Sequence, residues 1–368
     1  MIVFISLAIA LTFPVIFLFL LRRFDLYQTG QSRLNIVTLM GGIVAYYFAA
    51  QINPYLVNAG WATSDQVIRI WAPIVEEILK SIIIIYLVTR ADFNYIVDGV
   101  LYGFGAGIGF AIIENVEYVT GNPEIALIVA LARVFSTNLV HATGSGLIGT
   151  AWANQRGDKS NRAWLIILAG YAFSIFFHGL FNTLVSAGTT PIAFAIVYGV
   201  VGIGLIYAVI HRGMTIQKRW VSEKLTIADR AGKEDTKAAS KIEALDETLA
   251  PLKERFGQEK TDKVKEYISI QAEIGIKRKL LDSDTKDVRK AEVEKIIKNL
   301  VEETNILRNQ IGVYCMMMVR EVYLGQDIQS YNLLNARVAA SGSSQKGGGL
   351  WNRATERVKE SASKEDES

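Results

Sequence analysis

The sequence has one cysteine, Cys315, and three histidines among its 368 residues. A single cysteine excludes an internal disulfide framework and a cysteine-based metal site. The net charge is only +3, with 39 Lys and Arg against 36 Asp and Glu. A nucleic-acid-binding domain needs a basic face rather than many charges of both signs, so no nucleic-acid partner is expected.

Charge is scarce in the first part of the chain. Residues 1–213 hold 11 basic and 10 acidic residues, whereas the remaining 155 residues hold 28 and 26. A helix that spans a bilayer needs about 20 predominantly apolar residues. We therefore expect an all-α, polytopic membrane helix bundle of about seven transmembrane helices with a C-terminal soluble helical or coiled-coil domain. The expected spans lie near 2–21, 34–57, 67–88, 95–119, 125–153, 163–185 and 192–211.

Lysine and arginine are absent from every second loop between these spans, at 58–66, 120–124 and 186–191. The remaining loops contain them, and basic loops stay on the cytoplasmic side of a membrane. We therefore expect a multi-pass plasma membrane protein with its amino terminus outside and its C-terminal domain in the cytosol.

The chain after residue 213 is charge-rich and has a helical pattern. Apolar or near-apolar positions alternate steps of four and three, which predicts a coiled coil or helical bundle. They are Val293, Ile297, Leu300, Thr304, Leu307, Ile311, Tyr314 and Met318. Segments near 238–256 and 259–281 are the expected partner helices. A bundle that packs on itself is favoured over self-association or binding of a cytosolic partner. The expected domains are 1–213, a cytosolic helical domain at 214–339 and a disordered tail at 340–368.

Four consecutive spans carry ionisable groups where a membrane helix normally has none. An ionised side chain at the bilayer centre costs about 2.5–3.5 kcal/mol, so such groups normally face the bundle interior. Their presence on successive helices predicts a buried reactive site. The groups are Glu76, Glu77 and Lys80, then Glu114, His141 and His178.

Two adjacent glutamates, Glu76 and Glu77, precede Lys80 by one helical turn. Residues three and four apart are neighbours on a helix surface. Like charges resist joint ionisation and the ammonium favours it, so one carboxylate can act as a base. A buried structural ion pair is the simpler interpretation, but two glutamates exceed what one lysine neutralises.

Glycine recurs every four residues at Gly99, Gly103 and Gly107, and such faces let membrane helices approach closely. This packing is expected to bring Glu114 near the two glutamates. Arg133 is expected to neutralise one of the carboxylates.

His178 is followed four residues later by Asn182, which puts an imidazole and an amide on one helix face. Both can donate hydrogen bonds to a developing oxyanion. Glu76 and His178 lie roughly 14 and 10 Å from the outer ends of their spans. The site is therefore expected to open toward the outer half of the membrane. His141, counted from residue 125, lies deeper, which requires that span to tilt or to begin above the membrane.

These motifs together resemble the PrsW family of intramembrane proteases, which is related to the CAAX prenyl proteases and bacteriocin-processing enzymes. The resemblance covers roughly residues 35–210. The family usually has Asp four residues after the last histidine, whereas this chain has Asn, as CAAX-type relatives do. The motifs are Glu76-Glu77-x-x-Lys80, Phe110-x-x-x-Glu114, His141-Ala-Thr-Gly-Ser-Gly and His178-Gly-Leu-Phe-Asn182, in that order.

The resemblance implies hydrolysis of a peptide bond in a single-span or membrane-tethered protein. Glu76 is then the expected base, assisted by Glu77. Glu114 and His141 complete the water-activating site, and His178 with Asn182 stabilises the oxyanion. Glu114, His141 and His178 could also supply three ligands of a catalytic Zn²⁺ with a fourth position open. A metal-free glutamate mechanism uses the same residues, and the sequence leaves both open.

Intramembrane Glu, His and Lys also build proton relays, so a proton-coupled or ion transporter is an alternative. Transporters usually contain internal repeats and paired broken helices, and neither is evident here. A non-catalytic membrane scaffold with a cytosolic recruiting domain is a third interpretation.

Overall fold

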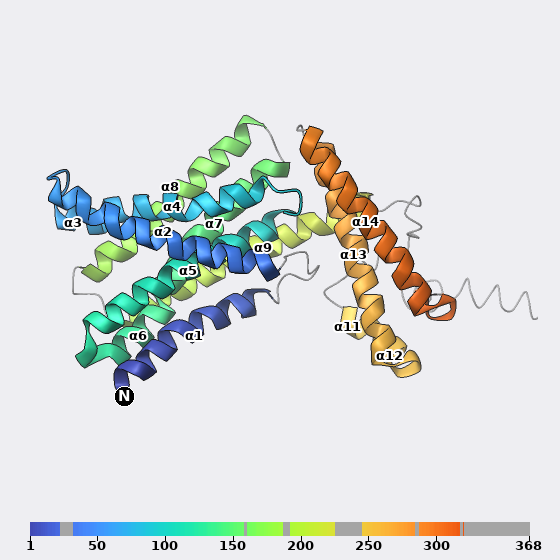
Figure 1. Cartoon of the computed structure of the whole chain (residues 1–368), viewed down its shortest axis with the longest axis horizontal. Helices are drawn as coiled ribbons and strands as arrows, with labels where there is room; N and C mark the ends of the chain where they lie inside the picture. The colour runs from blue at the N-terminus through green and yellow to red at the C-terminus, as the bar shows by residue number, and fades with distance from the viewer. Residues whose placement is uncertain are drawn as a thin grey trace, which may run out of the picture. The chain divides into compact units, whose positions relative to one another are not determined.

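A computed structural model of the chain describes residues 1–22, 32–157, 160–186, 192–224, 245–283, 287–316 and 319. Within these ranges every regular element is helical, as predicted (Figure 1). The longer helices of the first part are α1 (Ile2–Arg22), α2 (Ser32–Asn58), α4 (Ala72–Val88), α5 (Ile96–Gly121), α6 (Ala126–Phe135), α7 (Thr137–Gly157), α8 (Asn161–Ser186) and α9 (Ile192–Lys224).

Six helical segments of the described chain are long and apolar enough to cross a membrane, so the protein is a multi-pass membrane protein. The predicted count of seven spans is not confirmed. The missing span is the one at 67–88, where α4 has only 17 residues and contains three charged side chains. The short helix α3 (Ser64–Gln66) and the π-helical segment η1 (Val67–Trp71) precede α4 directly.

Helix α5 is the central helix of the membrane part. In its most apolar stretch of 18 residues 94% of the residues are buried, whereas in the corresponding stretch of α1 only 22% are buried. It packs most extensively against α7 and α2 (Figure 1). Large apolar side chains of the outer helices, such as Phe4, Phe48, Leu168 and Val200, are exposed. Such side chains suit contact with lipid tails, because only the interior of the bundle is covered by protein.

The glycines of α5 allow the close packing that the sequence predicts. A Cβ atom on Gly103 would overlap the carbonyl oxygen of Ser145 in α7, and one on Gly107 would overlap that of His141. On the other face, a Cβ on Gly109 would overlap the carbonyl oxygen of Leu39 in α2. The backbones of α5, α7 and α2 therefore approach each other where Glu114 and His141 meet.

Gly107→Ala is expected to lower stability by about 1–3 kcal/mol, the usual cost of overpacking. The added methyl group meets backbone atoms, which have no rotamer with which to move away. Thermal unfolding of the purified protein in detergent measures the change. Gly204→Ala in α9 is the matched control, because nothing lies within 4 Å of the added Cβ. Equal stability of the two variants contradicts the close helix contact.

The span expected at 125–153 consists of two helices and not one. A short 3₁₀ turn, η2 (Pro123–Ile125), leads into α6, which ends at Phe135. Ser136 then has non-helical dihedrals, φ −126° and ψ −82°, and α7 begins at Thr137. His141 therefore lies only one turn inside α7, and its ring contacts Glu114 of α5. The depth of His141 can therefore not be counted along one straight helix from residue 125, and the expected tilt of this span stays a prediction.

The soluble region contains α11 (Leu245–Thr248), α12 (Ala250–Phe256), α13 (Gln258–Ser283) and α14 (Asp287–Ile311). Helices α13 and α14 pack against each other, and Val293, Thr304 and Leu307 are buried, as predicted. The prediction for Tyr314 is wrong: its side chain is exposed, because α14 ends at Ile311 and Gly312 has a φ of +86°. A coiled coil is not confirmed. Residues 225–244, Met318 and the tail at 340–368 lie outside the described residues.

Helix α9 continues without a break past residue 213, the expected domain boundary, and packs against α13. Lys277 of α13 is fully buried, and its Nζ donates to the carbonyl oxygen of Ala91 at 2.7 Å. Burial lowers the pKa of Lys277 to about 8. Arg156 of α7 donates to the carbonyl oxygens of Val88 and Arg90. Cations favour the C-terminal end of a helix, so these two side chains stabilise the end of α4.

Candidate active site

Helix α4 carries the two glutamates one turn after a π-helical segment. Such segments occur frequently at functional sites. Lys80 Nζ lies 2.6 Å from Glu77 Oε1, and both side chains are completely buried. The lysine therefore neutralises Glu77, and within the described chain it makes no ion pair with Glu76.

Glu76 has a different environment from Glu77. Its Oε1 accepts a hydrogen bond from Asn53 Nδ2 at 3.3 Å, and its Oε2 has no hydrogen-bond partner among the described residues. His178 of α8 lies between the two carboxylates, with Nδ1 3.1 Å from Glu77 Oε1 and Nε2 3.7 Å from Glu76 Oε2. Asn53 is a site residue that the sequence analysis missed. An amide inside a predicted membrane span is the signal that could have identified it.

His141 connects α4 with α5. Its Nδ1 lies 3.1 Å from Lys80 Nζ, and its Nε2 lies 2.8 Å from Glu114 Oε2. The rings of His141 and His178 meet edge to face, with centroids 4.6 Å apart. The structure thus brings together all the ionisable residues that the sequence singled out.

Glu114 is paired with a cation, as predicted. Arg133 Nη2 lies 2.7 Å from Glu114 Oε2, and Arg133 Nε donates to Asn115 Oδ1 at 2.9 Å. Asn115 Nδ2 in turn donates to Asn138 Oδ1 at 2.9 Å. The ion pair was expected, but the two hydrogen bonds through Asn115 were not, and together they fix α5 against α6 and α7 behind Glu114.

One group of described residues could hold a metal ion. Glu76, His141 and His178 each offer a ligand atom, and these atoms lie within 4.8 Å of one another. The expected ligand set contained Glu114 in place of Glu76. Glu114 lies beyond His141 and contacts Arg133, whereas Glu76 has an oxygen without a partner.

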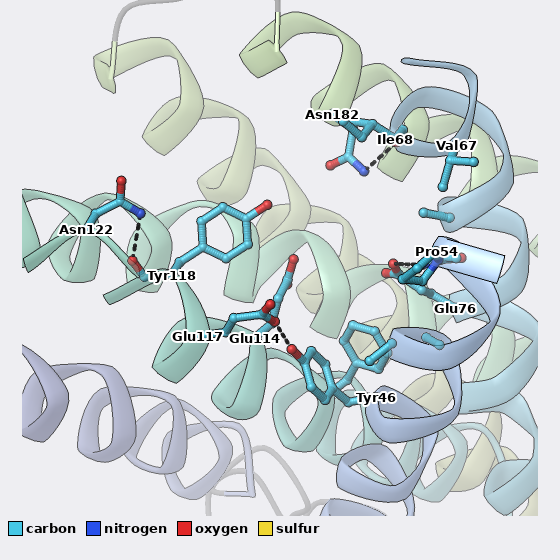
Figure 2. Close-up of a pocket in the computed structure, with 15 residues that line it drawn as sticks. Tyr46, Pro54, Val67, Ile68, Glu76, Glu114, Glu117, Tyr118, Asn122 and Asn182 are labelled. Carbon is cyan, nitrogen blue, oxygen red and sulfur yellow. Dashed lines mark hydrogen bonds between the residues drawn. The ribbon is translucent and has the colours of Figure 1, made fainter. Parts of the chain in front are cut away.

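A cavity of about 430 Å³ opens beside this cluster. Figure 2 shows Glu76 on one wall and Glu114, Glu117 and Tyr118 on the opposite wall. Asn182 also lines the cavity, but its Nδ2 donates to the carbonyl oxygen of Ile68 at 3.1 Å. The amide that was expected at the oxyanion therefore contacts the π-helical segment in this structure.

The site is thus a cluster of buried carboxylates and imidazoles beside a cavity, inside a bundle of candidate membrane-spanning helices. Residues 31–210 match the family described as PrsW family intramembrane metalloprotease. This match confirms the resemblance found in the motifs.

A curated relative supports the same assignment. It is the Protease PrsW of Geobacillus kaustophilus (strain HTA426), which is 29% identical over 118 residues. The aligned part covers 32% of this chain and 50% of the relative, so the chain spans about half the length of that protein. No solved structure matches the chain.

Proposed function

We propose that this protein is an intramembrane endopeptidase that hydrolyses a peptide bond of a membrane-associated protein. The observation that carries the proposal is the Glu76 carboxylate. It is buried, it lines the cavity, and one of its oxygens has no hydrogen-bond partner in the described chain. An oxygen in this position can take a proton from a water molecule or bind a metal.

The donor set fits a catalytic zinc. Ligand atoms on tetrahedral Zn²⁺ lie roughly 3.4 Å apart at the usual bond lengths. Glu76 Oε2 and His178 Nε2 are 3.7 Å apart. We therefore propose Glu76, His141 and His178 as ligands, a set that differs from the expected one by exchanging Glu114 for Glu76.

The remaining carboxylates suit a supporting role. A histidine that binds a metal usually donates its other N–H to a carboxylate, which fixes the ring. The carboxylate of Glu77 contacts one ring nitrogen of His178, and the carboxylate of Glu114 contacts one ring nitrogen of His141. His141 would then bind the metal through Nδ1. Lys80 contacts this atom, so its side chain would have to move aside.

The chemistry divides among these residues. A bound zinc supplies an activated water and polarises the scissile carbonyl. Glu77 and Glu114 hold the imidazoles in one tautomer, and Lys80 and Arg133 neutralise those carboxylates. In the metal-free alternative Glu76 itself takes the proton from water. In that alternative His178 and Asn182 stabilise the oxyanion, for which Asn182 must release the carbonyl oxygen of Ile68.

Elemental analysis of the purified protein decides between these versions. We expect about one zinc per chain, lost on His178→Ala. A protein that cleaves its substrate without bound metal contradicts the zinc assignment and favours the glutamate mechanism. A proton-flux assay in the same proteoliposomes tests the transporter alternative.

The cut is expected near the outer membrane boundary of a single-span substrate. Glu76 follows the start of α4 by four residues, and Glu114 and His178 precede the ends of α5 and α8 by seven and eight. The ends of α5 and α8 adjoin loops that lack Lys and Arg, and α4 follows the third such loop through α3 and η1, which contains Arg69. With η1 and α4 counted as a seventh crossing, we place these loops and the amino terminus outside and the domain at 214–339 in the cytosol. Mass spectrometry of the new termini measures the position, and a cut at the cytosolic boundary contradicts the orientation.

A further inference from the structure

Glu117 lies on the cavity wall one helical turn beyond Glu114. In the structure its Oε2 accepts a hydrogen bond from the hydroxyl of Tyr46 on α2, and both residues line the cavity (Figure 2). Tyr46 is buried, and its ring packs edge to face on Phe110 with centroids 5.3 Å apart. The glutamate is therefore held in place at the cavity.

The charges around the cavity are not balanced. Its lining contains three carboxylates, of Glu76, Glu114 and Glu117, and no lysine or arginine. Glu114 is neutralised by Arg133, whose guanidinium also lies over the ring of Tyr118 at 3.8 Å. Within the described ranges Glu117 makes no ion pair, and its hydrogen-bond partner is a neutral hydroxyl.

The position of Glu117 is also unfavourable for the helix that carries it. It precedes the end of α5 by four residues, and the last turn of α5 contains no basic residue. A carboxylate near a helix C-terminus interacts unfavourably with the helix dipole. Helix stability therefore gives no reason for an acid at this position, whereas binding of a cation does.

We propose that Glu117, positioned by Tyr46, binds a lysine or arginine side chain of the substrate. This inference rests on the proposed proteolysis, because it assigns specificity to the same cavity. Glu76, which we place at the scissile bond, lies on the opposite wall of the same cavity, so the recognised residue is expected within a few positions of that bond.

The test measures binding and cleavage separately. Binding uses the full-length Glu76→Gln variant in proteoliposomes. The probes are single-span peptides in which Lys, Gln or Glu occupies each position near the outer boundary in turn. At one position we expect the Lys peptide to bind about tenfold more tightly than the Gln peptide, as one charge-assisted hydrogen bond predicts.

Two substitutions are added in turn to the Glu76→Gln variant. Glu117→Gln is expected to abolish the preference for the Lys peptide, and Glu117→Lys is expected to create a preference for the Glu peptide. Glu124→Gln is the matched control, because Glu124 is exposed and lies outside the cavity lining. Equal binding of the Lys and Gln peptides at every position overturns the inference. So does a preference that persists in Glu117→Gln.

The cleavage arm uses the protein with Glu76 intact and the same peptides. We expect the mapped cut to lie within a few positions of the preferred lysine. Cleavage without a basic preference overturns the role of Glu117 and leaves the proteolysis intact. Binding with the preference, but with no cleavage above the Glu76→Gln background, contradicts the proteolysis and leaves the cation site intact.

Discussion

Glu76→Gln is expected to lower the rate of peptide hydrolysis by about 10²–10⁴-fold, the range that a positioned acid or base contributes. The amide keeps the shape of the side chain but can neither take a proton nor serve as an anionic metal ligand. Stability is expected to change little, because Glu76 is not paired with a lysine or arginine in the described chain. The measurement combines a cleavage assay in proteoliposomes with thermal unfolding in detergent.

Glu124→Gln makes the same chemical change at an exposed position outside the cavity and should leave the rate unchanged. A membrane-fraction blot confirms that both variants insert. Full activity of Glu76→Gln in the presence of normal insertion refutes the assignment of this carboxylate to the reaction.

Lys80→Met is expected to destabilise the protein by about 3–5 kcal/mol, the cost of leaving one partner of a buried ion pair unpaired. Lys80 and Glu77 are 2.6 Å apart and have no solvent exposure, so water cannot replace the missing charge. Glu77→Gln should have a similar effect, because it leaves the ammonium alone. Equilibrium unfolding in mixed micelles measures the free energy of unfolding.

The double variant Glu77→Gln with Lys80→Met separates stability from chemistry. Removing both charges is expected to restore most of the lost stability, since no unpaired buried ion remains. Hydrolysis should stay low, because His178 loses the carboxylate that orients its ring. A single variant as stable as the native chain contradicts the buried pair, and an active double variant contradicts the supporting role of Glu77.

Much of the fold follows from local patterns in the sequence. Long apolar runs predict helices wherever they occur, because a backbone in lipid must satisfy its own hydrogen bonds. The spacing of apolar residues predicts the packing of α13 against α14 in the same way. The predicted pattern ends at Gly312, where α14 has already stopped. The breaks at Ser136 and in η1 were not predicted. No proline or glycine lies at Ser136, whereas Pro73, which has no N–H to donate to the carbonyl of Arg69, lies just after η1.

The sequence by itself determined which residues meet at the site. An ionisable group inside an apolar span has to face the bundle interior. The sequence therefore identifies the site residues Glu76, Glu77, Glu114, His141 and His178. Only the tertiary structure decided how they pair. Glu77 binds Lys80, Glu114 binds Arg133, and Glu76 is left facing the cavity. These pairings depend on the rotation and register of helices that touch at glycine backbones, and no local pattern contains that information.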